Sequence, residues 1–375
     1  MKVLFLPFLQ IPSGHHHAAD AISSYFKQLD PSIQCKKVDI LHHTFGYGEK
    51  VISNLYLYAI QTMPAFYSWL YKNKAYDRIK SNKTFYFYEL LFLNSLKNLL
   101  KKEKPDLVIC THSLPSHLLN HLKHKNNLSI PVINVYTDFF VNILWGIQHI
   151  DVHFVPSVKI KQYLESKNVK PDRIFVTGIP VHPKIKKKKE RFEQKSEFHV
   201  LIAAGNLGVA PIESFFQKNK PSTKIKYHVL CGKNKKLFKK INQLGNPNII
   251  PIAYISCKEE MNSLYDQMDL VLTKPGGVTI SECLLKHIPM FIVHTLPGQE
   301  ELNEAFLLKH DLVLNKIYPL QKDQLDKTLL SFLENTDKRQ KHQEKLNEYM
   351  KSQVDMMDVI KQLFSQDIHK RLFGE

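Results

Sequence analysis

Cysteine is scarce in this chain of 375 residues, which has five of them. They are widely spaced and odd in number, so they form neither a disulfide framework nor a C-x-x-C zinc pattern. Long apolar runs are lacking too. None approaches the roughly 20 residues that cross a bilayer, and the first residues have no basic leader with a small-residue cleavage site. We therefore expect free thiols in a reducing cytoplasm and a chain that is neither secreted nor transmembrane.

Acidic side chains are the second shortage. The 52 Lys and Arg residues outnumber the 35 Asp and Glu residues, which gives a formal net charge of +17. An excess of this size indicates an anionic partner: a nucleic acid, an anionic membrane face or a phosphorylated small molecule. The alternative is that the lysines are simply solvated. Nothing in the sequence resembles an RNA-recognition motif or a helix-turn-helix, so we expect no nucleic-acid partner.

Short apolar runs alternate with helical patterns along most of the chain. With 43% hydrophobic residues, a chain of this length has material for two cores. Such alternation is typical of parallel strands joined by crossover helices. The expected strands are Val3–Leu6, Asp106–Cys110, Val132–Tyr136, His153–Pro156, Arg173–Thr177, His199–Ala203, Tyr227–Cys231, Asn248–Ile252, Leu270–Thr273 and Met290–Val293. We predict an α/β protein with two doubly wound domains, whose crevices lie at the carboxyl ends of the strands.

One basic run, from Lys184 to Arg191, interrupts the alternation. Its charge is typical of an exposed linker, so we place the domain boundary there. The expected division is a first domain over residues 1–183, a linker over 184–197, a second domain over 198–345 and a helical tail over 346–375. In this division the last helical pattern, about Asp355 to Phe364, follows the second domain.

Aromatic and basic residues crowd together between Val51 and Lys104. The pattern suits a helix in a lipid headgroup layer, with rings dipping inward and ammonium groups meeting anionic lipid. The alternative is a helix pair packed on the first domain, with solvated lysines. The candidate membrane or acceptor contacts are Trp69, Tyr71, Lys80, Lys83, Phe85 and Tyr86.

A glycine turn follows the strand-like run Leu270–Leu272, in the stretch TKPGGVTISE. Its proline and glycines favour a tight turn into a helix, and the first amides and positive dipole end of such a helix suit a diphosphate. The residues at this turn are Gly276, Gly277, Val278 and Thr279. Glu282 comes one helical turn after Thr279, where its carboxylate is placed to bind the two hydroxyls of a ribose.

A second polar cluster follows the next expected strand, in the stretch PGQEELN. Gln299 and Asn303 are spaced for one helix face, and Glu300 accompanies them. Amide and carboxylate side chains at a strand end suit the hydroxyls of a sugar.

Three consecutive histidines, His15 to His17, follow Gly14 in the stretch PSGHHHAADAI. Because the stretch follows the first expected strand and continues as a helical pattern, we interpret it as a strand-turn-helix and not as a tag. Adjacent residues on a helix point about 100° apart, so these side chains do not easily share one metal ion. A histidine titrates near neutrality and is able to accept a proton from a hydroxyl.

Taken in order, these motifs resemble the monogalactosyldiacylglycerol synthases and processive diacylglycerol glucosyltransferases of glycosyltransferase family 28. SGHHHAADAI matches the glycine-histidine turn of the first domain, VYTDF a strand end of that domain and VTGIPVHP the interdomain segment. VLCGKN matches a strand of the second domain, and TKPGGVTISE with PGQEELN its nucleotide-sugar site. The peptidoglycan N-acetylglucosaminyltransferase that acts on a lipid-linked sugar is a more distant relative.

The resemblance implies a GT-B fold: two Rossmann-like domains facing a central cleft, the second holding the UDP-sugar and the first the acceptor lipid. It implies an inverting hexosyltransferase in which an acceptor hydroxyl attacks the sugar directly. No Asp-x-Asp occurs in the chain, so we expect no metal ion, and no cofactor besides the UDP-sugar substrate.

Carried over residue by residue, the resemblance places His15 on the family histidine, as the expected base or as a clamp that hydrogen-bonds the acceptor hydroxyl into place, with Gly14 beside the acceptor. Asp138 is expected to orient that base or to bind acceptor, with a helix cap as the alternative. Gly205 and Gly208 fall on a family glycine-rich turn that has fewer glycines here. Asn142 stands near the position where some relatives have a histidine, and an amide cannot act as a base.

The expected function is transfer of glucose or galactose from a UDP-sugar to diacylglycerol or a related lipid, at the cytoplasmic face of an anionic membrane. Two alternatives stay open. One is transfer from UDP-N-acetylglucosamine to a polyprenyl-linked acceptor. The other is a non-catalytic basic protein that binds membranes or nucleic acid.

Overall fold

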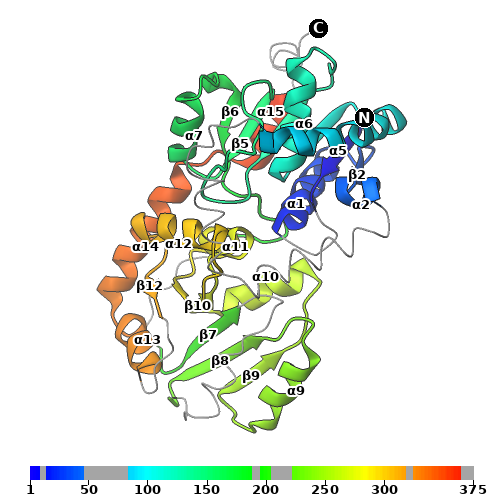
Figure 1. Ribbon diagram of the computed structural model, residues 1–375. Helices are drawn as coiled ribbons and strands as arrows, with labels where there is room; N and C mark the ends of the chain where they lie inside the picture. The colour runs from blue at the N-terminus through cyan, green and yellow to red at the C-terminus, as the bar shows by residue number, and fades with distance from the viewer. Residues whose placement is uncertain (9–13, 46–82, 188–194, 204–221, 318–323, 365–375) are drawn as a thin grey trace. The chain divides into compact units, whose positions relative to one another are not determined.

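The apolar runs of the sequence form the strands of two parallel sheets in a computed structural model (Figure 1). The structure describes residues 1–8, 14–45, 83–187, 195–203, 222–317 and 324–364; of residues 45 and 83–88 it describes the backbone alone. Contacts divide the chain into two compact units. The first contains Met1–Pro183, Pro297–Gln299 and Ser352–Glu375, and the second contains Lys184–Leu296 and Glu300–Lys351.

The sheet of the first unit has the order β2-β1-β3-β4-β5-β6, with parallel neighbours throughout. Its strands are β1 (Lys2–Leu6), β2 (Gln34–Lys37), β3 (Leu107–Cys110), β4 (Val132–Val135), β5 (Val152–Val155) and β6 (Ile174–Val176).

The sheet of the second unit has the order β12-β11-β10-β7-β8-β9, again parallel. Its strands are β7 (Phe198–Ala203), β8 (Ile225–Leu230), β9 (Ile249–Ile252), β10 (Leu270–Thr273), β11 (Met290–Ile292) and β12 (Asn315–Lys316). The predicted α/β class and all the expected strands are confirmed. The sequence reasoning missed β2 and β12, because these edge strands are largely exposed and carry no apolar run.

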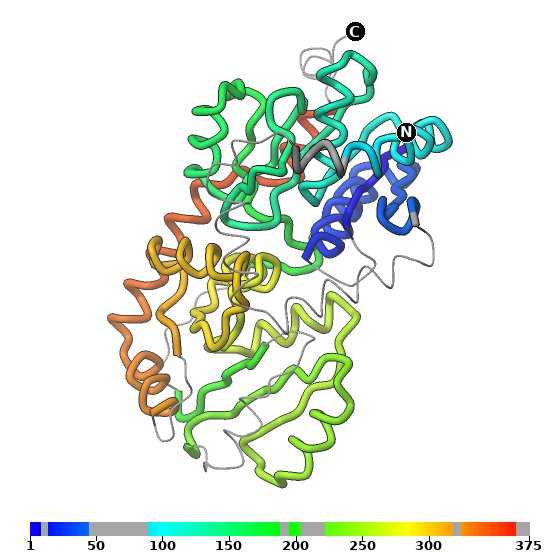
Figure 2. The backbone as a smooth tube through the Cα atoms, viewed as in Figure 1, coloured from blue at the N-terminus to red at the C-terminus, as the bar shows by residue number. Residues whose placement is uncertain are grey.

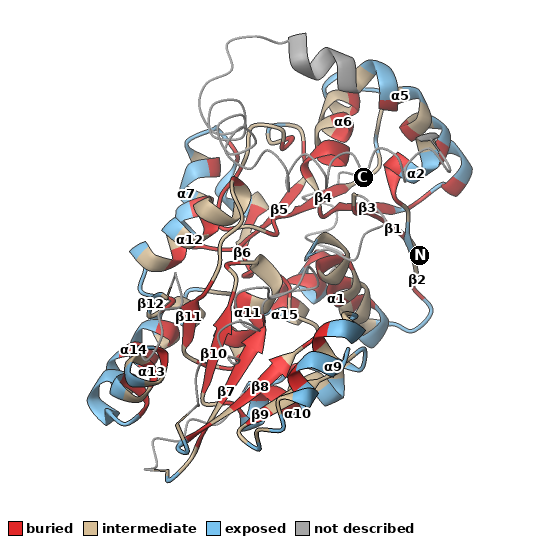
Figure 3. Ribbon diagram, turned by 60° about the horizontal axis from the view of Figure 1, so that its bottom comes forward, coloured by how far each residue is buried: buried red, intermediate tan, exposed pale blue. Residues whose placement is uncertain are grey.

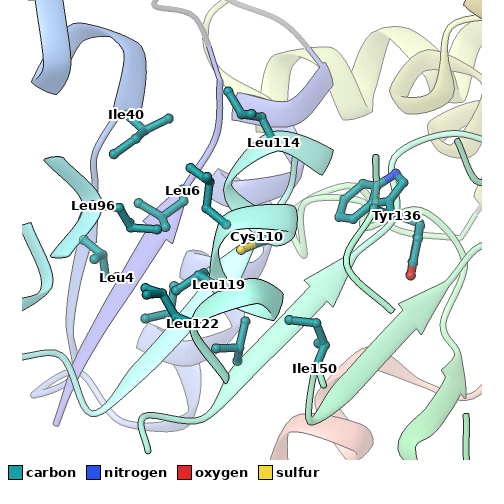
Figure 4. Close-up of a cluster of buried hydrophobic side chains, with 14 of the residues drawn as sticks. Leu4, Leu6, Ile40, Leu96, Cys110, Leu114, Leu119, Leu122, Tyr136 and Ile150 are labelled. Atoms are coloured by element: carbon teal, nitrogen blue, oxygen red, sulfur yellow. The ribbon is translucent and has the colours of Figure 1, made fainter. Parts of the chain in front are cut away.

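Helices cover both faces of the first sheet, because alternate residues of each strand point to opposite sides. In β1, Leu4 and Leu6 belong to a core with α5 and α6 (Figure 4), whereas Val3 and Phe5 belong to a core with α1 and α15. The helical elements of this unit are α1 (Gly14–Leu29), α2 (Ile40–Phe45), α5 (Lys83–Glu103), α6 (Ser113–His124), α7 (Val158–Glu165), the 3-10 turn η3 (Pro171–Arg173) and α15 (Met356–Phe364).

The chain end returns to the first unit, which differs from the expectation that its last helix follows the second domain (Figure 2). Val354 donates its amide to the carbonyl of Val176 on β6 at 2.8 Å. From there α15 packs on α1, and Phe364 meets Phe26 edge to face at 5.4 Å. The cause is the apolar face of α15, which completes the core over β1.

In the second unit, α9 and α13 belong to one core with the sheet, whose central strands are buried (Figure 3). The helices are α9 (Lys235–Gln243), α10 (Lys258–Gln267), α11 (Gly277–Leu285), α12 (Gln299–Lys309), α13 (Leu325–Leu333) and α14 (Thr336–Lys351). Helix α14 runs through the boundary expected at residues 345 and 346 without a break.

Each sheet has a point where its strand order reverses. In the first sheet β1 lies between β2 and β3, and in the second β7 lies between β8 and β10. Ligands of doubly wound sheets bind beyond the carboxyl ends of the strands at such switch points. The segments that follow β1, β3 and β10 are therefore the places to look for chemistry.

Candidate active site

His15 stands at the switch point of the first sheet, as the second residue of α1. Its Nδ1 atom lies 2.7 Å from the carbonyl oxygen of Thr111, the residue that follows β3. A carbonyl oxygen only accepts hydrogen bonds, so Nδ1 carries the proton. In the neutral ring Nε2 then holds the lone pair, which is the form that a general base requires.

Thr137 and Asp138, just beyond the end of β4, approach the same ring. The hydroxyl of Thr137 lies 3.0 Å from Nδ1 of His15 and, in the other direction, donates to Oδ2 of Asp138 at 3.5 Å. The carboxylate therefore lies one hydroxyl away from the imidazole. The structure brings the two predicted residues His15 and Asp138 together, and Thr137 stands between them.

His112 is the second ring at this site. It caps α6: its Nδ1 accepts a hydrogen bond from the amide of Leu114 at 3.1 Å. Its ring stacks on Phe8 with 4.5 Å between ring centroids and meets His15 edge to face at 4.7 Å. Burial, followed by the nearby His15, holds the pKa of His112 well below its usual 6.5.

The environment of His15 favours the neutral ring. Burial lowers its pKa below the usual 6.5, and this effect outweighs the charge of Asp138 and the Thr111 hydrogen bond, which both raise it. His16 lowers the pKa further. His15 is therefore ready to accept a proton at neutral pH.

The other two histidines of the triple do not join His15 at a metal centre. His16 and His17 are half-buried on α1. In the described part of the chain, no group of three or more His, Cys, Asp or Glu side chains has the arrangement of a metal site. His15 itself is held at the ends of β3 and β4, through Thr111 and Thr137.

The glycine turn of the second unit leads from β10 into α11. Gly276 occupies the position before the helix, and no side chain caps the helix there. The first amides of a helix have no partner within it, so those from Gly277 to Thr279 are available to an anion. A Cβ at Gly276 would meet nothing within 4 Å, which means that space is open beside the turn. This arrangement suits a diphosphate.

Glu282 is held by side chains from α10. Its side chain is buried, at 6% exposed; Oε2 accepts from the hydroxyl of Tyr265 at 2.9 Å, and Oε1 accepts from Nζ of Lys258 at 3.1 Å. Burial, followed by the charge of Glu282, raises the pKa of Tyr265 well above its usual value, so the phenol keeps its proton and donates it. The carboxylate is thus oriented in advance on the face of α11.

The residues of PGQEELN lie at and beyond the start of α12, which begins at Gln299. Asn303 is buried and donates from Nδ2 to the carbonyl of Pro275 at 3.1 Å, so it supports the glycine turn. Oε2 of Glu300 accepts from the amide of Leu296 at 2.7 Å. Both side chains therefore shape the loops around β10 and β11.

Several residues expected at the site lie where the structure does not describe side chains. Gly205, Gly208, Trp69, Tyr71 and Lys80 lie outside the described residues. Lys83, Phe85 and Tyr86 are in the first turns of α5, where only the backbone is described. Gly14 is exposed and begins α1.

Five residues of these two sites were missed by the sequence reasoning. They are Thr111, His112 and Thr137 around His15, and Lys258 and Tyr265 around Glu282. The sequence did carry a signal for Thr111 and His112, because these two polar residues directly follow the apolar run of an expected strand. Lys258 and Tyr265 had no such signal, because they approach Glu282 only through the packing of α10 on α11.

Comparison with known proteins gives the class that this fold and these sites belong to. The model of the family described as monogalactosyldiacylglycerol (MGDG) synthase matches residues 15–181, and that of the glycosyltransferase family 28 C-terminal domain matches residues 184–371. The chain belongs to glycosyltransferase family 28, and it is a UDP-sugar-dependent hexosyltransferase.

Among relatives, the glycosyltransferase YkoN of Bacillus subtilis (strain 168), itself uncharacterized, is 39% identical over 366 residues, covering 96% of this chain and 97% of the relative. A processive diacylglycerol beta-glucosyltransferase of Bacillus cereus (strain G9842) is 27% identical over 318 residues, covering 82% and 80%. The crystal structure of MurG from Acinetobacter baumannii superposes with a TM-score of 0.61 at 15% identity, covering 97% and 99%. That likeness confirms the expected GT-B fold.

Among the helices that the structure describes, none is long and apolar enough to cross a bilayer.

Proposed function

We propose that this enzyme transfers glucose or galactose from a UDP-sugar to diacylglycerol, with inversion at the anomeric carbon, on an anionic membrane surface. The observation that carries the proposal is the 2.7 Å contact between Nδ1 of His15 and the carbonyl oxygen of Thr111, from which we infer that Nδ1 carries the proton and Nε2 is the proton acceptor. Support for the lipid acceptor comes from the name of the Bacillus cereus relative.

The reaction proposed is a single displacement. The acceptor hydroxyl gives its proton to Nε2 of His15 as its oxygen attacks the anomeric carbon. The bond from that carbon to the diphosphate oxygen breaks, and UDP leaves with the bonding electrons. The charge that develops on the diphosphate is stabilised by the amides at the start of α11, in the region of Gly277 to Thr279.

The donor contacts are proposed from the same elements. Glu282, oriented by Tyr265 and Lys258, accepts hydrogen bonds from the ribose hydroxyls. Asn303 keeps the glycine turn in place through Pro275, and Gln299 and Glu300 are proposed to meet the sugar hydroxyls.

The membrane contact is proposed from α5. Leu90 is 67% exposed and Leu91 is 37% exposed, and Lys101 and Lys102 are exposed on the last turn of the helix. Exposed apolar and cationic side chains on one helix suit an anionic lipid surface, where leucines enter the headgroup layer and lysines meet phosphate. The proposed location is the cytoplasmic face of the membrane.

The experiment mixes the enzyme with phosphatidylglycerol vesicles that contain diacylglycerol and supplies UDP-glucose, UDP-galactose or UDP-N-acetylglucosamine in separate reactions. Released UDP is measured, the lipid product is identified by mass spectrometry, and its anomeric configuration is read by NMR. We expect a β-linked hexosyldiacylglycerol with a UDP-hexose. Vesicles without diacylglycerol serve as the control, and vesicles with a polyprenyl-linked acceptor in place of diacylglycerol form a further arm. UDP release only in that arm and only from UDP-N-acetylglucosamine would overturn the proposal.

A further inference from the structure

His112 is held in place by two independent sets of contacts. Its Nδ1 accepts the amide of Leu114 and so completes the start of α6. Its ring contacts Phe8 on one side and meets His15 edge to face. A side chain whose polar atom is tied to a helix end and whose ring lies between aromatic neighbours has little freedom to rotate.

The cap also fixes the charge of His112. Because Nδ1 accepts the Leu114 amide, the proton of the neutral ring is on Nε2, and protonating Nδ1 would break the cap. Burial and the nearby His15 hold the pKa of His112 well below its usual range. His15 therefore has a neutral ring beside it at neutral pH, held in place by the cap.

We infer that His112 is a positioning residue for the transfer reaction: its cap-locked ring fixes the ring plane of His15 and keeps water away from it. The inference rests on the proposed role of His15 as the base. Thr111 supplies the link between the two rings, because its carbonyl binds Nδ1 of His15 and it precedes His112 in the chain. A shift of His112 therefore moves both the hydrogen-bond acceptor and the packing surface of the base.

The titration of His15 reports on this packing. Burial, to which the His112 ring contributes, has the largest effect and lowers the pKa of His15. Asp138, which follows β4, raises this pKa, and His16, on the same helix, lowers it. Replacing the ring of His112 by a smaller side chain admits water, so the pKa of His15 is expected to rise toward its usual value. The Nδ1–H tautomer is expected to lose its dominance at the same time.

Two variants separate the ring of His112 from its cap. His112→Asn keeps a side-chain oxygen able to cap α6 and removes the ring, because asparagine is a favoured capping residue. His112→Phe keeps a ring against Phe8 and His15 and removes the cap. Ser157→Ala is the matched control for a lost cap, because Ser157 caps α7 in the same unit by accepting the amide of Ile160.

The measurements are kcat on the diacylglycerol vesicles, the thermal unfolding midpoint, and the tautomer and titration of His15 by histidine-labelled NMR, assigned with His15→Asn. For His112→Asn we expect kcat to fall roughly 10–100-fold, as for a misplaced catalytic group, with an unchanged midpoint and a His15 that titrates at higher pH. For His112→Phe and Ser157→Ala we expect lower midpoints and a largely retained kcat.

A His112→Asn enzyme with the kcat, tautomer and titration of the wild type would overturn the inference. So would a kcat that simply follows the unfolding midpoint across the three variants. Failure of the proposed function gives a different pattern. If His15→Asn keeps full turnover, His15 is not the base, but an altered His15 titration in His112→Asn still supports the positioning.

Discussion

The Nδ1 atom of His15 lies 2.7 Å from the carbonyl oxygen of Thr111, a residue 96 positions away in sequence. This contact joins the start of α1, the helix that follows β1, to the end of β3 at the switch point of the first sheet. A ring tied in this way presents one defined nitrogen to a substrate. The contact is the structural basis on which we propose His15, among the three consecutive histidines, as the base.

Replacing His15 by alanine is expected to lower turnover by roughly 10²–10⁴-fold, which is the usual contribution of a general base. The affinity for the UDP-sugar is expected to stay near that of the wild type, because Glu282 and the first amides of α11, which are proposed to hold the UDP, lie in the second unit. Steady-state kinetics and calorimetric titration with UDP measure the two effects. His17→Ala is the matched control on the same helix, and equal losses in both variants would contradict the assignment.

The pH profile of kcat/KM is expected to fall on its acidic side at a pH below 6.5. Burial lowers the pKa of His15, so the ring stays neutral, and active as a base, until the pH drops through that lowered pKa. The measurement is kcat/KM with a UDP-hexose between pH 4.5 and 8, on vesicles whose own charge is constant over this range. An acidic limb centred above 6.5 would argue that another group is the base.

Tyr265→Phe is expected to weaken donor binding with little change in kcat. The substitution removes the hydrogen bond that orients Glu282, and the loss of one such bond to a charged group costs about 1.5–3 kcal/mol. The KM for the UDP-sugar and the Kd for UDP report it. Tyr163→Phe, on α7 in the other unit, is the control. Unchanged donor binding in Tyr265→Phe would contradict the proposed contact between Glu282 and the ribose.

Ile360→Ala is expected to destabilise the first unit by roughly 2–5 kcal/mol, the range for an aliphatic side chain lost from a core. Ile360 lies on α15, is fully buried and packs with the side chains of β1 and α1. Urea unfolding measures the loss. Lys361→Ala, on the exposed face of the same helix, is expected to stay close to the wild type. A mild effect at Ile360 would mean that α15 is only loosely docked.

His153 is expected to make the first unit sensitive to acid. Burial lowers its pKa to about 3, and the hydroxyl of Tyr136 lies 3.1 Å from its Nδ1. The unfolded chain takes up this proton near pH 6.5 and the folded chain does not. The free energy of unfolding is therefore intact above pH 6.5 and falls by up to about 1.4 kcal/mol per pH unit below it, until the pH reaches about 3.

Urea unfolding at pH 7.0 and 5.5 tests this slope in the wild type and in His153→Gln, which cannot take up the proton. We expect the slope to be reduced in the variant. His43→Gln, exposed on α2, should keep the wild-type slope. If His153→Gln is as sensitive to acid as the wild type, groups other than His153 cause the loss of stability.

Much of the fold was open to prediction from the residues. Apolar runs such as Val132–Val135 and Leu270–Thr273 are buried on both faces and so read as strands without any tertiary information. The edge strands β2 and β12 are largely exposed and gave no such signal. The position of α15 was not predictable either. An amphipathic pattern indicates that one face of the helix is buried, but it does not indicate which sheet the helix packs on.

The sequence by itself determined the class of this protein: alternating strands and helices, a glycine turn that opens a helix after β10, and a histidine after the first strand. These are local properties, because each depends on residues that are neighbours in the chain. Only the tertiary structure decided what surrounds the reactive groups. Thr111 and Thr137 reach His15, and Tyr265 and Lys258 reach Glu282, across long sequence separations. Such contacts depend on strand order and helix packing, and they set the tautomer of His15 and the orientation of the Glu282 carboxylate.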